Sequence, residues 1–264
     1  MFGSNLHARC RRAPRGAALR VRELCLAACV ALFACAATAR ADAIAYSTFD
    51  TGADGWNAVS LGTSGGVVLT SVVTWEAAGG NPDGHISRTD PQAGSTFYFN
   101  APAKFLGNVS AAYGGTLTYD FRRTAGTVFN AGDVILRGGA TPLTIVFDAP
   151  HPTTNWTPFA IPLSAGQWRV GSLSGAFATD QQITGVLSAL TSLRIRGEYI
   201  NGSETGRLDN VSLNAPVPEP ASLALMGTGL AGVAFAARRR YRARRRARSR
   251  PSRHAYVEPP WVSL

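Results

Sequence analysis

The stretch FYFNAPAKFLGNVSAAYGGTLTYDF, residues 97–121, contains the pattern that decides the fold. At its end, Leu117, Tyr119 and Phe121 alternate with polar residues, as in a β-strand with one buried face and one solvated face. Two consecutive glycines at 114–115 come just before this run, and such pairs mark turns. The stretch therefore predicts a half-buried strand that begins directly after a turn.

The same alternation of apolar and polar residues recurs further along the chain. Leu143, Ile145 and Phe147 repeat it, and Leu193 and Ile195 repeat it once more. Additional strands are expected at residues 66–75, 85–88, 96–99, 133–137, 157–163 and 208–213, separated by turns rich in glycine, proline and asparagine.

Residues 180–190 carry the helical signal of this region. Thr179 and Gln182 have the spacing of a capping box, and the apolar residues that follow share one helical face: Ile183, Val186, Leu187 and Leu190. Short strands with one brief helix predict an all-β fold for residues 44–214, an antiparallel β-sandwich.

Charge is unevenly distributed along the chain. The 264 residues carry a net charge of +10, yet residues 44–214 hold nine basic and 12 acidic residues and a net charge of −3. The excess of arginine belongs to residues 1–43 and 215–264. Nucleic-acid binding by the central domain is therefore not expected.

The N-terminal segment, residues 1–43, has the composition of a secretory signal peptide. Arginines precede an apolar run at residues 24–37, and small residues that suit signal peptidase follow at residues 39–43. All 4 cysteines lie in this segment, so the central domain has no disulfide, cysteine metal site or cysteine nucleophile. Cys35 fits a lipoprotein box, which leaves lipidation as an alternative to the favoured ordinary cleavage.

The C-terminal segment combines three signals in a fixed order. The motif Val217, Pro218, Glu219, Pro220 lies in residues 215–220, a charge-free run follows at 221–237, and a tail at 238–264 opens with Arg238, Arg239 and Arg240. Because 17 residues at about 1.5 Å each reach the lower limit of a bilayer core, the run is expected to form a single transmembrane helix. The arginines are expected on the cytoplasmic side, which leaves the central domain outside the membrane.

This arrangement resembles the PEP-CTERM sorting tail of exported bacterial proteins. In that family, an exosortase is held to cut near the motif and to pass the protein to the cell surface or to exopolysaccharide. The resemblance implies signal peptidase, an exosortase-like enzyme and the membrane as partners. It also implies an inner-membrane anchor first, and a location at the cell surface or in the matrix after processing. The chain departs from the family pattern by continuing to Leu264, and the sequence does not identify the bond that is cut.

Three phrases of the central domain resemble the laminin B domain, also called laminin IV type A. They are residues 97–121, DVILRGG at 133–139 and LTSLRIRGEYINGSETGRLDNVSL at 190–213. Phe49-Asp50 and Gly55-Trp56 fit the usual start of that domain. The resemblance covers nearly all of residues 46–214. It implies a jelly-roll sandwich related to carbohydrate-binding modules, and it implies no reaction.

Two sets of side chains are candidates for binding. Related sandwiches often hold an ion between their first and last strands, so Asp50 and Asp209 are candidate ligands of a structural Ca²⁺; local hydrogen bonding of Asp209 is the alternative. Arg194, Arg196 and Glu198 are expected to point the same way from one strand. They would either contact a polysaccharide or form a solvated, salt-bridged face. No other cofactor is expected.

These observations favour an exported, non-enzymatic surface or matrix protein that acts in adhesion or in interaction with exopolysaccharide. Catalysis is not expected, because the central domain has neither an HExxH motif nor a Gly-x-Ser-x-Gly elbow. One alternative is a carbohydrate-binding module with a specific glycan, which an aromatic groove would favour. The other is a carbohydrate-active enzyme, which two carboxylates facing each other across a cleft would favour. The sequence identifies neither the ligand nor the oligomeric state.

Overall fold

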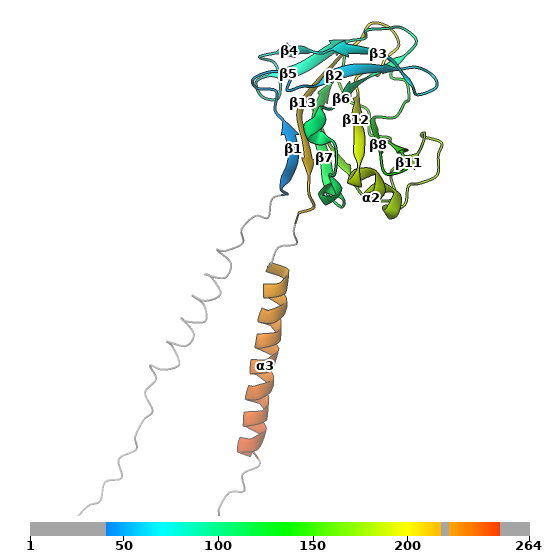
Figure 1. The fold of residues 1–264 in the computed structure, drawn as a ribbon. Helices are drawn as coiled ribbons and strands as arrows, with labels where there is room; N and C mark the ends of the chain where they lie inside the picture. Colours follow the sequence, from blue (N-terminus) through cyan, green and yellow to red (C-terminus); the bar gives the residue numbers. More distant parts are fainter. Residues whose placement is uncertain (1–40, 218–221, 249–264) are drawn as a thin grey trace, which may run out of the picture. The chain divides into compact units, whose positions relative to one another are not determined.

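The structure, a computed structural model, describes residues 41–217 and 222–248 (Figure 1). One compact unit, Arg40–Pro218, contains both sheets, and helix α3 (Ser222–Arg248) belongs to a second unit. Every strand pairing and every buried core residue of the described chain lies within the first unit. Among the described residues, the core of the sandwich is therefore built from Arg40–Pro218 alone, and we call this unit self-contained.

Two antiparallel sheets form this sandwich. The six-stranded sheet has the order β10 (Thr157–Pro162), β7 (Thr116–Arg122), β13 (Thr205–Asn214), β5 (His85–Thr89) and β4 (Thr74–Glu76), and β1 (Ala43–Ser47) also pairs with β13. The seven-stranded sheet has the order β11 (Arg169–Val170), β9 (Leu143–Phe147), β8 (Val134–Gly138), β12 (Leu190–Arg196), β6 (Thr96–Asn100), β2 (Asn57–Leu61) and β3 (Val67–Val72). All pairings are antiparallel. The chain crosses repeatedly between the sheets, for example from β6 to β7 and back to β8, as expected of a jelly roll.

The core lies between the two sheets, and the alternating residues of the sequence supply it. Leu117, Tyr119 and Phe121 are buried from β7, and Leu193 and Ile195 are buried from β12. Fully burying a side chain of this size contributes about 1.5–3 kcal/mol. The predicted antiparallel β-sandwich is therefore confirmed, and the alternation correctly identified its inward-facing residues.

The short helix of the sandwich is α2 (Asp180–Ser188), and single turns of 3₁₀ helix occur at η1 (Ala103–Phe105) and η2 (Ser110–Ala112). The predicted capping box is present, since the Thr179 hydroxyl accepts from the Gln182 amide and the Gln182 side chain accepts from the Thr179 amide. The helix is shorter than predicted because Leu190 already belongs to β12. The buried face of α2 consists of Ile183, Val186 and Leu187.

Some strands differ from the prediction. The expected strand at residues 66–75 is two strands, β3 and β4, which belong to different sheets. The prediction missed β2 because four of its five residues are buried in succession, so the strand has no polar alternation. It also missed β1, which begins at Ala43 and overlaps the end of the predicted signal segment.

Helix α3 covers most of the apolar run and continues through the basic block, so Arg238, Arg239 and Arg240 lie within it and are exposed. Across residues 41–217 and 222–248, no helix is both long and apolar enough to cross a membrane. The predicted transmembrane helix at residues 221–237 is therefore not confirmed. Most of the predicted signal segment, including Cys35, lies outside the described residues, as do Pro218, Glu219, Pro220 and the tail beyond Arg248.

Candidate functional site

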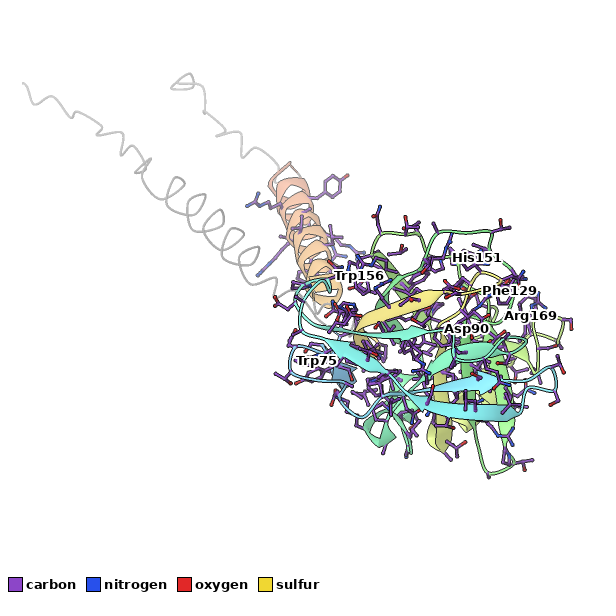
Figure 2. The ribbon with its side chains drawn as sticks, turned by 90° about the horizontal axis from the view of Figure 1, so that it is seen from above. Trp75, Asp90, Phe129, His151, Trp156 and Arg169 are labelled. Carbon is purple, nitrogen blue, oxygen red and sulfur yellow. The ribbon has the colours of Figure 1, made fainter. Side chains whose placement is uncertain are left out.

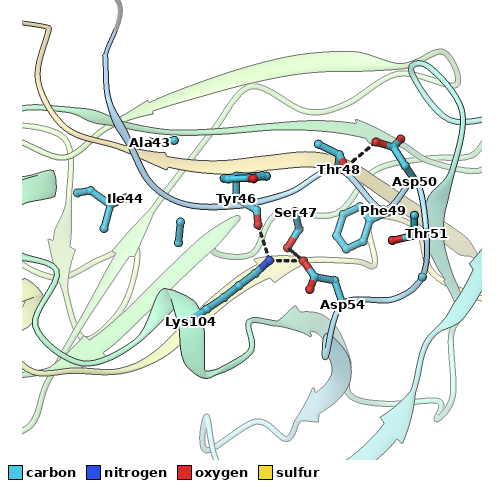
Figure 3. A pocket seen from close by; sticks show the side chains of 12 residues that line it. Ala43, Ile44, Tyr46, Ser47, Thr48, Phe49, Asp50, Thr51, Asp54 and Lys104 are labelled. Carbon is cyan, nitrogen blue, oxygen red and sulfur yellow. Dashed lines mark hydrogen bonds and ion pairs between the residues drawn. The ribbon is translucent and has the colours of Figure 1, made fainter.

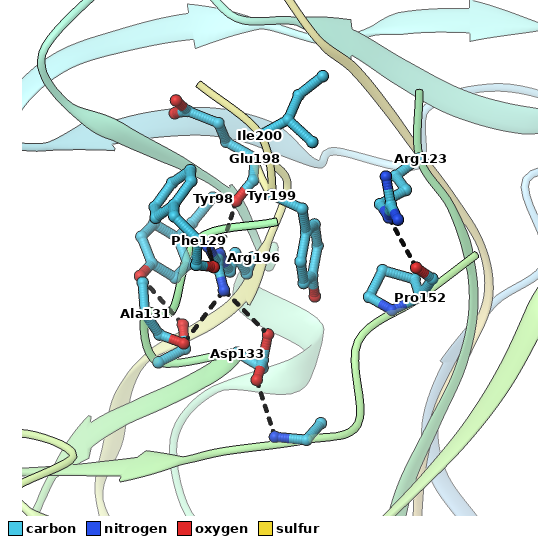
Figure 4. A network of polar contacts seen from close by, with 12 residues as sticks. Tyr98, Arg123, Phe129, Ala131, Asp133, Pro152, Arg196, Glu198, Tyr199 and Ile200 are labelled. Carbon is cyan, nitrogen blue, oxygen red and sulfur yellow. Dashed lines mark hydrogen bonds and ion pairs between the residues drawn. The ribbon is translucent and has the colours of Figure 1, made fainter. Parts of the chain in front are cut away.

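A buried guanidinium group organises one end of the sandwich. Arg196, at the end of β12, has an exposed fraction of 0%, and its side chain donates hydrogen bonds to three backbone oxygens, those of Phe129, Ala131 and Glu198 (Figure 4). The guanidinium also lies over the rings of Phe129 and Tyr199, with its central carbon 4.5 Å and 4.3 Å from the two centroids. Arg196 therefore ties the loop before β8 to the segment after β12.

The network includes a buried carboxylate. Arg196 Nη1 lies 3.5 Å from Asp133 Oδ1, and Asp133 Oδ2 accepts from the Ala149 amide at 2.8 Å. Burial raises the pKa of Asp133, while the Ala149 amide and Arg196 lower it. Both side chains have an exposed fraction of 0%, so their pairing offsets part of the cost of removing them from water.

The expectation that Arg194, Arg196 and Glu198 form a shared solvent-facing surface is wrong for two of them. Arg196 is enclosed by the network, and Glu198 is buried with its Oε2 accepting from the Phe97 amide at 3.1 Å. Arg194 is half-buried and does face outward from the seven-stranded sheet. The alternating sequence predicted the side of β12 on which Arg194 and Arg196 lie. It could not show that the loop at residues 129–132 covers the C-terminal end of β12.

Asp50 is near enough to Asp209, at one corner of the six-stranded sheet, for its charge to raise the pKa of the Asp209 carboxyl. Asp209 lies at a bulge in β13, and its carboxylate accepts from the Asn81 amide at 2.6 Å and from the Asn210 amide at 2.7 Å. Burial raises the pKa of Asp209 to about 6; these two amides lower it, and the nearby charges of Asp120 and Asp50 raise it. Asp209 thus anchors the loop after β4 to the last strand.

This corner shows local hydrogen bonding at the predicted calcium ligands. Asp50 Oδ2 accepts from the Thr48 hydroxyl at 2.7 Å. Within the described ranges, no group of three or more histidine, cysteine, aspartate or glutamate side chains is placed to hold a metal ion. The Asp50 and Asp209 carboxylates would be hard oxygen ligands of the type that Ca²⁺ prefers, so calcium binding here stays a prediction.

Two surface pockets accompany these features. One, of about 490 Å³, lies beside β1, where Lys104 contacts the Tyr46 carbonyl and the Asp54 carboxylate (Figure 3). The other, of about 530 Å³, lies among the loops that follow β2, β5 and β12 and includes Asp90, Phe129 and Glu198. We call the second one the loop pocket. Its loop residues come from separate parts of the chain, and nothing in the local sequence pattern indicated that they would meet.

Glu198 is the loop-pocket residue with the largest change in acidity. Burial raises its pKa to about 7, the Phe97 amide lowers it, and the charge of Asp90 raises it. Such a carboxyl is partly protonated near neutral pH, so it can both donate and accept hydrogen bonds there. The chemistry of the loop pocket is therefore compatible with hydroxyl-rich ligands.

The tryptophans divide between core and rim. Trp56 and Trp168 are buried, as is usual for large apolar side chains. Trp75 and Trp156 are more exposed, and each indole donates to a backbone oxygen, those of Phe49 and Gly79 (Figure 2). His85 is buried and packs edge-on against Trp156.

Comparisons of the sequence with known proteins agree with this geometry. Residues 98–226 match the family model described as Laminin B (Domain IV), and residues 216–240 match the PEP-CTERM protein-sorting motif. Human laminin subunit gamma-2 is 32% identical over 195 residues, covering 65% of this chain and 14% of that subunit. The Caenorhabditis elegans basement membrane proteoglycan is 30% identical over 128 residues, covering 48% of this chain and 4% of that protein. The chain thus spans only a small part of the length of the curated relatives it matches.

Among solved structures, the L4b domain of human laminin alpha-2 superposes with a TM-score of 0.55 at 18% identity, covering 65% of this chain and 96% of that domain. This likeness supports the β-sandwich fold. The two family models therefore show a region similar to the laminin B domain, followed by a match to the PEP-CTERM protein-sorting motif.

Proposed function

We propose that this chain is an exported, envelope-sorted, non-enzymatic module that associates with extracellular polysaccharide and acts in adhesion or matrix interaction. The observation that carries the proposal is the order of the two matched regions, a laminin B domain followed by a sorting motif that indicates export to the envelope. In our proposal, the sorting motif directs the sandwich to the polysaccharide-rich surroundings of the cell.

The sorting steps are part of the proposal. Signal peptidase removes the N-terminal segment, and the C-terminal helix holds the chain at the inner membrane until an exosortase-like enzyme cuts near Pro218-Glu219-Pro220. The processed sandwich then reaches the cell surface or the matrix. The exposed arginines at 238–240 in α3 would act as the stop on the cytoplasmic side.

The test replaces Pro218, Glu219 and Pro220 with alanine in the native host and compares the variant with the unaltered chain. The proposal predicts that the unaltered protein co-purifies with extracellular polysaccharide, whereas the variant stays in the membrane fraction. A control variant with alanine at Ser252 and Arg253, beyond the motif, should distribute like the unaltered chain. Identical distributions of the motif variant and the unaltered chain would overturn the sorting steps.

A second candidate function is recognition of one specific glycan in the loop pocket. Its volume of about 530 Å³ lies within the usual range of small-ligand sites, and Phe129 offers an aromatic surface beside the polar groups. Isothermal titration with oligosaccharides would detect it. Saturable binding that is lost in Phe129→Ala and kept in Tyr46→Ala, which alters an exposed aromatic residue outside the loop pocket, would favour this function over general matrix association.

The loop pocket also bears on catalysis, because Glu198 with a raised pKa lies near the charge of Asp90. Glycosidases use a protonated and an ionised carboxyl in this manner. Our proposal of a non-enzymatic module predicts that the protein releases no reducing ends from polysaccharides. Release that disappears in Glu198→Gln would refute it and establish the enzyme instead.

A further inference from the structure

The outer face of the seven-stranded sheet has a distinctive charge distribution. Residues 44–214 contain 12 acidic residues, yet none of the seven strands described in this sheet includes an aspartate or a glutamate. The same strands carry four arginines, Arg137, Arg169, Arg194 and Arg196. Arg196 is neutralised by Asp133, whereas the other three form no ion pair with any residue in the described ranges. The sheet therefore presents three uncompensated positive charges on a domain whose net charge is negative.

The strand register places these arginines on one side of the sheet. Ile195 pairs with Val134, and both belong to the core, so Arg194 and its neighbour Ile135 face outward. Arg137 lies two residues beyond Ile135 on β8 and is exposed. Arg169 pairs with Val146 on the same side, because the adjacent Val170 pairs with the core residue Ile145. We call these three residues the arginine face.

The side chains of the arginine face are held in place but lack anionic partners. Burial lowers the pKa of Arg194, Tyr98 raises it, and the charge of Arg137 lowers it, so the guanidinium groups of Arg194 and Arg137 repel each other. The Nε of Arg194 is buried and has no hydrogen-bond partner. The guanidinium carbon of Arg169, a residue labelled in Figure 2, lies 4.1 Å from the ring centroid of Phe177, which is 53% exposed. Arg169 also donates to the Gly175 carbonyl.

A bound anion would relieve this repulsion and would satisfy the unpaired donor. Polar groups without charge surround the arginines on the same side of the sheet, including Asn57, Asn100 and Thr144. The Oδ1 of Asn57 is also buried without a partner. Amides and hydroxyls of this kind pair with sugar hydroxyls, and planar guanidinium groups pair with planar carboxylates.

We propose that the arginine face binds the carboxylate groups of a uronic-acid-bearing polysaccharide. Arg137 and Arg194 contact the carboxylates, and Arg169 with Phe177 forms one border of the surface. This inference rests on the proposed function, because it names the chemical class of the polysaccharide with which the module associates. Charge complementarity selects the ligand, since neutral glycans would leave the two repelling arginines unpaired.

The experiment measures binding of residues 40–218 to polygalacturonate and to neutral dextran by affinity gel electrophoresis. This self-contained unit is used because the arginines of α3 would bind polyanions on their own. The test variant is Arg137→Gln with Arg194→Gln. The matched control is Arg122→Gln with Arg207→Gln, which removes the same charge from the six-stranded sheet. Circular dichroism establishes that each variant is folded.

We expect polygalacturonate to bind at least about tenfold more tightly than dextran, with the preference lost in the test variant and kept in the control. Added salt should weaken the binding. Equal binding of both glycans by all variants would overturn the inference and leave the proposed function standing, whereas no binding to any glycan would overturn both.

Other occupants of the face give different results. Equal loss in the test and control variants would mean that net charge alone attracts polyanions, which refutes the arginine face. Binding of duplex DNA as tight as that of polygalacturonate, with the same dependence on Arg137 and Arg194, would refute the polysaccharide. A dimer in sedimentation that the test variant abolishes would assign the face to a second copy of the chain.

Discussion

Replacement of Arg196 by methionine would remove the guanidinium group of the buried network while keeping a side chain of similar length. Three backbone carbonyls would each lose a charged donor, and the buried Asp133 would lose its cationic partner. Loss of one partner from a buried ion pair typically costs about 3–5 kcal/mol. Hydrogen bonds to charged groups are worth about 1.5–3 kcal/mol each, although such losses are not additive.

From these contacts we expect Arg196→Met to lower the free energy of unfolding by about 4 kcal/mol, a large share of the 5–15 kcal/mol of a typical domain. The assay is urea unfolding of residues 40–218, followed by the fluorescence of the buried Trp56 and Trp168. With a denaturant slope of about 2 kcal/mol per molar, the midpoint should fall by about 2 M.

The matched control is Arg194→Met, two residues earlier on β12. Arg194 is half-buried, and no ion pair in the described part of the chain includes it, so its replacement should cost less than about 1 kcal/mol. Midpoints that fall equally in the two variants, or by less than about 0.5 M in Arg196→Met, would refute the role given to the network.

Three further predictions follow from the same structure. Folding raises the pKa of Glu198 from its ordinary 4.5 to about 7, so between these pH values the folded state retains a proton that the unfolded chain releases. The free energy of unfolding should therefore fall as pH rises from 4.5 to 7. Thermal melting across this range should show a shallower decline in Glu198→Gln, and an unchanged pH dependence would contradict the assignment. A Cβ at Gly80 would lie 2.5 Å from the Gly84 oxygen and 2.7 Å from Asp209 Oδ2. Gly80→Ala should therefore lower the free energy of unfolding by about 1–3 kcal/mol and the melting temperature by several degrees. The control Gly52→Ala, where no atom lies within 4 Å of the added Cβ, should leave the melting temperature unchanged. Signal peptidase should cleave before Asp42, because the Asp42 carbonyl accepts from the Ala215 amide. Cleavage before Ile44 would remove Asp42 and the first residue of β1. N-terminal sequencing would distinguish a mature chain that begins at Asp42 from one that begins at Ile44.

Local patterns in the sequence predicted much of the sandwich. The alternation at Leu117, Tyr119 and Phe121 identified a core strand, because every second side chain of a strand points to the same face of its sheet. The capping box of α2 was equally local, since Thr179 and Gln182 contact each other across three residues. Features of this kind depend on residues that lie close together in the sequence.

The binding surfaces depend on tertiary structure and were less predictable. Arg196 and Arg194 share one strand and one side, and only the loop that packs over Arg196 makes one buried and the other half-buried. The proximity of Asp50 and Asp209, through which one charge affects the pKa of the other, gives no local signal, because the two residues are far apart in the chain; only the family resemblance suggested it. The arginine face likewise emerges only when the strand order brings β8, β11 and β12 into one sheet.

Intact-mass spectrometry of the protein from the extracellular polysaccharide fraction of the native host tests the central claim most directly. The account predicts a chain that begins near Asp42, ends near Pro220 and lacks α3, bound to polysaccharide. A protein that extends to Leu264 and is found only with the membrane would contradict it.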